Sequence, residues 1–184
     1  MTKLNLENFE EVLQKRVNSK LNSYLNSNTQ IEKAIKFALS TPGKRVRPTL
    51  MYLVGDIYNI SLERLDSIAS ASEIIHTYSL VHDDLPCMDD DDLRRGQPTL
   101  HKKYSEATAV LAGDAMQSLA IQIILKDKKL SNELKVSIIK LLMESIGYKG
   151  MILGQEQDIS FEQKTVGKEE IVQMNYLKTG LLIE

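Results

Sequence analysis

The chain of 184 residues is poor in cysteine, proline and glycine, with one, four and nine of these residues respectively. A single cysteine, Cys87, excludes an intramolecular disulfide and is typical of a reducing compartment. So few prolines and glycines, together with few alternating runs of β-branched residues, favour an all-α fold. We expect one domain over residues 1–184, because a chain of this length ordinarily forms a single sizeable core.

Strong charge imbalance and long apolar runs are also missing. The formal net charge is −2, so composition gives no argument for binding nucleic acid or an anionic membrane. No window approaches 18 uninterrupted apolar residues, and the N-terminal sequence MTKLNLENFEEVLQKR has no apolar signal-peptide core. We therefore expect a cytoplasmic protein without a membrane span.

The densest group of charges is the segment 79–96, SLVHDDLPCMDDDDLRRG. Two arginines, Arg94 and Arg95, cannot neutralise its six aspartates, whose mutual repulsion must be offset by further positive charge. Hard divalent cations would do this, and all-oxygen ligation favours Mg²⁺, with Mn²⁺ as an alternative, over zinc. The segment therefore predicts a Mg²⁺–phosphate site in which the arginines bind phosphate oxygens. The six acids are Asp83, Asp84, Asp89, Asp90, Asp91 and Asp92.

An acidic run by itself is more often a solvated loop. Here, however, the first two aspartates continue directly from an apolar segment, and the run ends in Arg-Arg-Gly rather than in polar filler. Pro86 should end the preceding helix. In a regular helix Asp83 and Asp89 would point about 120° apart, so unwinding near Pro86 allows both to reach one ion.

Apolar residues recur at helical spacing along most of the chain, and Thr29, Ser61 and Ser131 are expected N-caps. His76, Ser79 and Asp83 share one helix face, which indicates a helix that lines a cavity. Taken alone, Lys178 reads as a surface lysine, His76 as a core histidine and the cations at 44, 45 and 47 as a solvated turn. Helices are expected over 4–25, 31–39, 48–58, 61 to about 83, 107–125, 133–146, 148–159 and 168–184.

Four motifs in order resemble those of the bacterial trans-isoprenyl diphosphate synthases, closest to the farnesyl diphosphate synthase (geranyltranstransferase) type. They are GKRVRP at 43–48, DDLPCMD at 83–89 (a DDxxxxD aspartate motif), RRG at 94–96 and KTG at 178–180. The chain resembles the N-terminal two-thirds of that family. The resemblance implies an antiparallel helical bundle of the isoprenoid synthase type around a central cavity, with the C-terminal helices absent, and usually a homodimer.

The activity implied by this resemblance joins isopentenyl diphosphate to dimethylallyl or geranyl diphosphate and gives farnesyl diphosphate. Mg²⁺ on the aspartates would neutralise the leaving diphosphate as the allylic substrate ionises. By resemblance, Asp83, Asp84 and Asp89 hold the metal, Arg94, Lys178 and Thr179 bind the allylic diphosphate, and Gly43, Lys44, Arg47, His76 and Arg95 bind isopentenyl diphosphate. Arg45 belongs to the same substrate-binding motif, and Thr179 and Gln155 direct oxygens at the carbocation.

Tyr78 and Ser79 precede the aspartate motif at positions where, in the resembling family, bulk limits product length, so a C15 product is expected. The family's second aspartate motif is missing, so we expect a truncated enzyme with little or no turnover. Two alternatives stay open: a non-catalytic diphosphate-binding helical subunit and a class I terpene cyclase. GKRxRP and the paired arginines argue against the cyclase, because a cyclase has no second diphosphate to bind.

Overall fold

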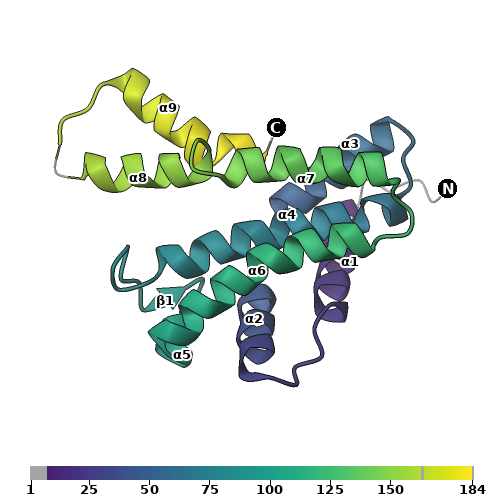
Figure 1. Ribbon diagram of the computed structural model, residues 1–184, viewed down its shortest axis with the longest axis horizontal. Coiled ribbons are helices and arrows are strands. Elements are labelled where there is room, and N and C mark those ends of the chain that lie inside the picture. The colour runs from purple at the N-terminus through teal and green to yellow at the C-terminus, as the bar shows by residue number, and fades with distance from the viewer. Residues whose placement is uncertain (1–7, 163, 184) are drawn as a thin grey trace. The chain divides into compact units, whose positions relative to one another are not determined.

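A computed structural model describes residues 8–162 and 164–183. The chain divides into two compact units, residues 1–130 and 131–184, and each is described by itself (Figure 1). Within the described ranges the regular elements are helices, apart from one ribbon of two-residue strands. This confirms the expected all-helical fold, while the single domain over 1–184 stays a prediction.

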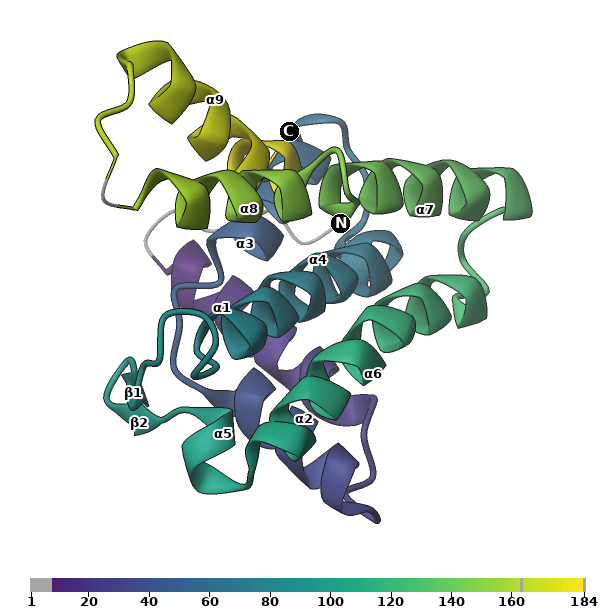
Figure 2. The same ribbon diagram turned by 60° about the vertical axis from the view of Figure 1, so that its left-hand side comes forward.

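The first unit is organised around two long helices, α4 and α6, which lie side by side in opposite directions (Figures 1 and 2). Most of α4 is buried, because α1, α2 and α3 also pack against it. Its small residues Ala69, Ser70 and Ala71 allow these neighbours to come close. The elements of this unit are α1 (Phe9–Ser23), α2 (Gln30–Ser40), α3 (Val46–Ile57), α4 (Leu62–Asp83), β1 (Leu93–Arg94), β2 (Gln97–Pro98), α5 (Leu100–Lys103) and α6 (Glu106–Lys126).

Helix α6 is the one helix among the described residues that is long and apolar enough to cross a membrane by length and composition. A core helix of a globular unit meets the same criteria. Ala109, Ala112 and Met116 of α6 are fully buried, and the helix packs along α4. The length of α6 is therefore weak support for a membrane span.

The expected helix starts are largely found. Thr29 forms a complete capping box with Glu32, since its hydroxyl accepts a bond from the Glu32 amide and the Glu32 carboxylate accepts one from the Thr29 amide. Ser131 accepts a bond from the Leu134 amide, 3.2 Å away. Ser61 precedes α4 but makes no capping bond with its side chain. The start of α3 differs from expectation, because its N-cap is Arg45 in a left-handed conformation.

The second unit contains α7 (Asn132–Ile146), α8 (Met151–Phe161), α9 (Lys168–Lys178) and a short 3₁₀ helix, η1 (Gly180–Leu182). Helices α8 and α9 form an antiparallel pair (Figure 2). They approach each other closely at Gly154, where an added Cβ would lie 2.3 Å from the Lys178 nitrogen. The expected helix over 168–184 is wrong in extent, since α9 ends at Lys178.

Three further details separate the expected elements from those found. The short helix α5 and the β1–β2 ribbon lie in a stretch that was expected to be loop. Residues 4–7 of the first expected helix and residue 184 of the last lie outside the described residues. The other helix ends agree to within a few residues, the usual uncertainty of such boundaries.

Candidate functional site

A basic pocket of about 450 Å³ lies between the start of α3, the middle of α4 and the β1–β2 turn. Cationic side chains come to it from two segments fifty residues apart in sequence, and α4 contributes a histidine and an acid. The walls are formed by Gly43, Lys44, Arg45, Val46, Arg47, Glu73, His76 and Arg95. The structure therefore brings together all the residues that the sequence predicted to bind isopentenyl diphosphate.

Arg47 is a residue of the pocket wall with a buried donor that lacks a hydrogen-bond partner. This donor is its Nε atom. Burial lowers the pKa of Arg47 from its ordinary value, while the carboxylate of Glu73 acts in the opposite direction. Because an unpaired buried donor is unfavourable, an anion bound in the pocket would be stabilised by a hydrogen bond from Arg47.

His76 faces the same pocket from α4. Burial, followed by the charges of Arg47 and Arg95, lowers the pKa of His76 to about 3. The imidazole is therefore neutral near pH 7 and offers one donor and one acceptor nitrogen rather than a further charge.

The aspartate loop (residues 84–92) folds back on the end of α4. Helix α4 ends at Asp83, and the amide of Asp89 donates to the Asp83 carbonyl oxygen over 2.9 Å. The amides of Met88 and Asp90 both donate to the carbonyl oxygen of Leu85. The main chain therefore brings Asp83 and Asp89 together, in agreement with the expected break near Pro86.

Asp84 has a different environment from the other aspartates of the motif. It is buried, and its Oδ1 accepts hydrogen bonds from Nε of Arg94, at 2.8 Å, and from Nη2 of the same residue. Burial raises the pKa of Asp84, and the Arg94 guanidinium opposes this shift. Arg94 also donates to Asp91 over 2.9 Å. Asp84 therefore anchors Arg94, and its expected role as a metal ligand stays a prediction.

The ribbon that follows directs the two arginines apart. Leu93 and Arg94 of β1 pair with Gln97 and Pro98 of β2, and the two residues between them have positive φ angles of 54° and 77°. This is the geometry of a tight type I′ hairpin. Arg94 consequently reaches Asp84, while Nη1 of Arg95 donates to the Pro42 carbonyl oxygen over 2.9 Å.

The donor set at the end of α4 fits Mg²⁺. Among the described residues no group of three or more His, Cys, Asp or Glu side chains is already assembled around a metal position. Mg²⁺ commonly takes only one or two protein carboxylates and completes its octahedron with waters and substrate phosphates. Asp83 and Asp89, the expected ligands, would supply such a pair of carboxylates.

Three other predicted site residues belong to the second unit. Nζ of Lys178 lies 2.5 Å from Oδ2 of Asp158, which joins α9 to α8. Gln155 is half-buried on α8. Thr179 is exposed just after α9, and its amide donates to the Asn175 carbonyl oxygen.

Tyr78 and Ser79 lie on α4 between the basic pocket and the aspartate loop. Tyr78 is buried with its ring edge-on to His82 at 5.9 Å, and its hydroxyl has no hydrogen-bond partner. Burial raises the pKa of Tyr78 to about 12. The Ser79 hydroxyl donates to the His76 carbonyl oxygen.

Sequence reasoning missed two groups of supporting residues. Glu73 lines the basic pocket and lies three residues before His76, a spacing that places both on one helix face. Thr99 fixes the arginine hairpin through its hydroxyl to the Asp91 carbonyl oxygen. The signal for Glu73 was available, since it is the only charged residue between Asp66 and His76. No comparable pattern marked Thr99.

Comparisons with known proteins point to one family. The polyprenyl synthetase family model matches residues 28–184. The chain is 44% identical over 183 residues to the farnesyl diphosphate synthase of Haemophilus influenzae, covering 95% of the chain and 62% of the relative. It is 45% identical over 159 residues to that of Escherichia coli, covering 85% of the chain and 53% of the relative.

A solved structure gives the same result for the fold. The crystal structure of a geranyltransferase from Legionella pneumophila superposes with a TM-score of 0.91 at 41% identity, covering 96% of this chain and 64% of that one. This confirms the isoprenoid synthase fold and the absence from this chain of the C-terminal part of its relatives. The chain spans about three fifths of the length of the first two relatives. With its motifs, its fold and these matches in agreement, the chain belongs to the polyprenyl synthetase family.

Proposed function

We propose that this chain forms the diphosphate-binding part of a trans-prenyltransferase that joins isopentenyl diphosphate to dimethylallyl or geranyl diphosphate and gives farnesyl diphosphate. The observation that carries the proposal is the unpartnered, buried Nε of Arg47 in a pocket that it shares with Lys44 and Arg95. Several cations around one pocket, with a donor left unpaired, favour an anionic ligand that carries more than one negative charge. A diphosphate, with several acceptor oxygens, meets that requirement.

In this mechanism the basic pocket binds the substrate that does not ionise. Lys44, Arg47 and Arg95 hold the isopentenyl diphosphate group. Neutral His76 donates one hydrogen bond to it, so the orientation is fixed without further positive charge. Holding the nucleophilic double bond in place converts an encounter of two molecules into a step within one complex.

The allylic diphosphate belongs, in this proposal, to the aspartate side. Asp83 and Asp89 would hold Mg²⁺, which supplies charge neutralisation for the departing diphosphate. Asp84 holds the Arg94 guanidinium in position to bind the same group. The family resemblance further assigns Lys178 to this diphosphate, and Thr179 and Gln155 to directing oxygens towards the carbocation. Asp84 as a further metal ligand remains part of the proposal.

Tyr78 limits product length in this scheme. It is a bulky, buried side chain on α4 five residues before Asp83. Replacing it by alanine would open space beside α4, so Tyr78→Ala in the active enzyme is expected to extend part of the product beyond C15. Chromatography of the dephosphorylated products measures this. Unchanged product length would remove Tyr78 from this role.

The binding proposal is tested by a calorimetric titration of the chain with isopentenyl diphosphate in the presence of EDTA. Arg47→Met is expected to weaken binding at least about tenfold, because a charge-assisted contact is lost. Arg64→Met is the matched control, since Arg64 is an exposed arginine on the same unit. Absence of binding to the unaltered chain, or equal losses in both variants, would refute the proposal.

Turnover separates the remaining alternatives. Conversion of geranyl and isopentenyl diphosphates to a C15 diphosphate supports the transferase. Tight binding without any conversion, both by this chain and by the product of its full reading frame, supports a diphosphate-binding subunit instead. A terpene cyclase would consume an allylic diphosphate alone. A homodimer and a cytoplasmic location stay predictions that rest on the family resemblance and composition.

A further inference from the structure

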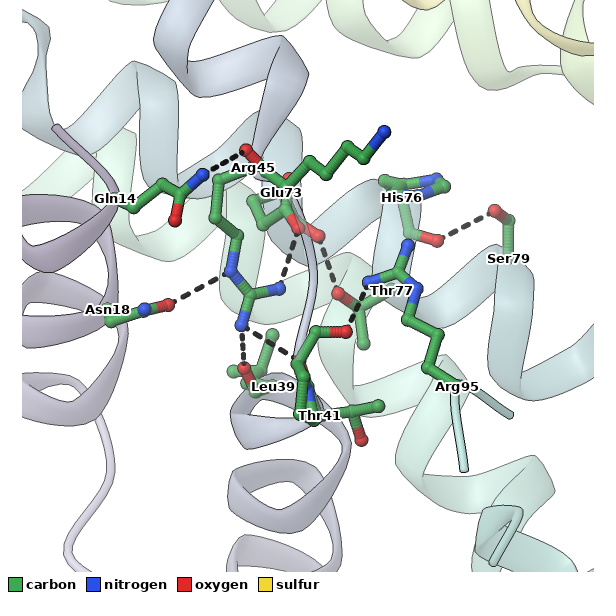
Figure 3. Close-up of polar contacts among 12 residues, drawn as sticks. Gln14, Asn18, Leu39, Thr41, Arg45, Glu73, His76, Thr77, Ser79 and Arg95 are labelled. Atoms are coloured by element: carbon green, nitrogen blue, oxygen red, sulfur yellow. Dashed lines mark hydrogen bonds and ion pairs between the residues drawn. The ribbon is translucent and has the colours of Figure 1, made fainter. Parts of the chain in front are cut away.

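Arg45 forms part of the wall of the basic pocket, but its guanidinium is bonded within the protein. Its Nε donates to Oδ1 of Asn18 at 2.9 Å, and its Nη1 donates to Oε1 of Glu73 at 2.8 Å. Its Nη2 donates to the carbonyl oxygens of Leu39, at 2.7 Å, and Thr41, at 3.1 Å. Figure 3 shows the guanidinium between α1, the end of α2 and α4, with these four contacts drawn as dashed lines. Four of its five N–H donors are therefore engaged by the protein.

The backbone of Arg45 explains why such an anchor is needed. Its φ angle is +49°, in the left-handed region that is unfavourable for a residue with a side chain. This conformation starts α3, because the Arg45 carbonyl oxygen accepts the bond from the Thr49 amide. Lys44 precedes Arg45, and Arg47 follows it two residues later. The direction of both pocket cations therefore depends on Arg45 keeping its conformation.

Glu73 is the acid that makes this burial tolerable. Both side chains of the ion pair are almost completely buried, at 4% and 3% exposed. An arginine taken out of water needs a partner of opposite charge, and loss of either member leaves an uncompensated charge. Glu73 nevertheless lines a pocket whose other charged residues are cations. By charge alone, this carboxylate would weaken the binding of any anion there.

We propose that Arg45 and Glu73 are a positioning pair, which holds the basic segment (residues 43–47) so that Lys44 and Arg47 face a diphosphate, rather than a substrate ligand and its counter-ion. The inference rests on the proposed diphosphate-binding function and replaces the substrate-binding role expected for Arg45. It makes a prediction with an unusual sign. Removing the negative charge of Glu73 from the pocket should weaken anion binding, because the segment loses its anchor.

The test is a calorimetric titration of the full chain with inorganic diphosphate in EDTA, at a temperature where circular dichroism reports every variant as folded. Glu73→Gln is expected to raise the Kd at least about tenfold, since a small misplacement of binding groups has effects of this size or greater. Arg45→Lys should also weaken diphosphate binding, although it keeps the positive charge, because one ammonium group cannot reach acceptors in four directions. Arg45→Met and Glu73→Gln should be non-additive in the double variant, since both release the same segment.

Asp66→Asn is the matched control. Asp66 lies seven residues before Glu73 on α4, is equally buried, and accepts two bonds from Arg16 at 2.6 and 2.9 Å. Breaking this pair should lower stability by a similar mechanism and leave the Kd for diphosphate unchanged. If Glu73→Gln does not fold, the milder Asn18→Ala, which removes one acceptor from Arg45, should raise the Kd about threefold.

Each outcome decides the matter. Equal or tighter diphosphate binding by folded Glu73→Gln, or by Asn18→Ala where the former does not fold, would overturn the positioning role and leave the pocket intact as a diphosphate site. An Asp66→Asn variant that binds as weakly as Glu73→Gln would also overturn it, because general destabilisation would then explain both. An unaltered chain that does not bind diphosphate would overturn the proposed function itself, together with the inference built on it.

Discussion

The neutral state of His76 gives a prediction about stability and pH. The pKa of His76 is lowered to about 3 by burial and by Arg47, Arg95 and two further arginines, whereas an exposed histidine in the unfolded chain has a pKa of about 6.5. Between these two values the unfolded chain binds a proton that the folded protein excludes. This contribution to stability is therefore complete above about pH 7 and is progressively lost as the pH falls.

The size of the effect follows from the two pKa values. Lowering the pH from 7 to 5 should remove about 2 kcal/mol of unfolding free energy through His76 alone. Urea unfolding at pH 5, 6 and 7, followed by circular dichroism, measures this in the unaltered chain and in His76→Gln. The difference between their pH slopes isolates the histidine, because all other titrating groups are shared.

Equal pH slopes in the two proteins would refute the reasoning. His76 would then take up its proton as readily in the folded state as in the unfolded chain, and the pocket would contain enough water or negative charge to hold an imidazolium among arginines. A proton NMR titration of the ring resonances gives an independent measurement. The prediction requires that the His76 ring signals do not titrate between pH 8 and pH 5.

Three further predictions concern packing, capping and metal. Gly154→Ala should destabilise the α8–α9 pair by about 1–3 kcal/mol, because the new methyl group meets main-chain atoms of Lys178. Thermal unfolding measures this, with Ser160→Ala, at an exposed position of α8, as the control. Thr29→Ala should lower the unfolding free energy by about 1 kcal/mol through loss of the capping box, and no change would mean that Glu32 alone stabilises the start of α2. Asp89→Asn should abolish most of the gain in diphosphate affinity that Mg²⁺ confers. Asp90→Asn, a change at the exposed neighbouring aspartate, should retain this gain. Equal losses in the two variants would argue against a metal site formed by Asp83 and Asp89.

Local patterns in the sequence predicted the parts of the fold that depend on local physics. Thr29 and Ser131 can be recognised as N-caps from the sequence, because an N-cap side chain binds the main-chain amide only three residues later. The end of α4 followed from Pro86, which cannot continue a helix. The expected helix over 168–184 is longer than α9, because apolar residues continue past Thr179 at a spacing that also suits a 3₁₀ turn.

The direction of individual side chains was harder to predict. Lys44, Arg45 and Arg47 look alike as members of one basic motif, but Arg45 is buried. The distinction depends on Asn18, Leu39 and Glu73, which lie on three other parts of the chain, so no local pattern could reveal it. The same holds for Asp84, because its partner Arg94 lies ten residues later and is brought to it by the fold of the aspartate loop between them.

Gly43 and Arg95 make the two basic motifs dependent on each other. A Cβ at position 43 would lie 2.0 Å from Nη1 of Arg95, the atom that donates to the carbonyl oxygen of Pro42. Any side chain at Gly43 would therefore displace an arginine that is fifty-two residues away in sequence. A substitution at Gly43 is therefore expected to act on the basic pocket through the position of Arg95 as well as through its own bulk.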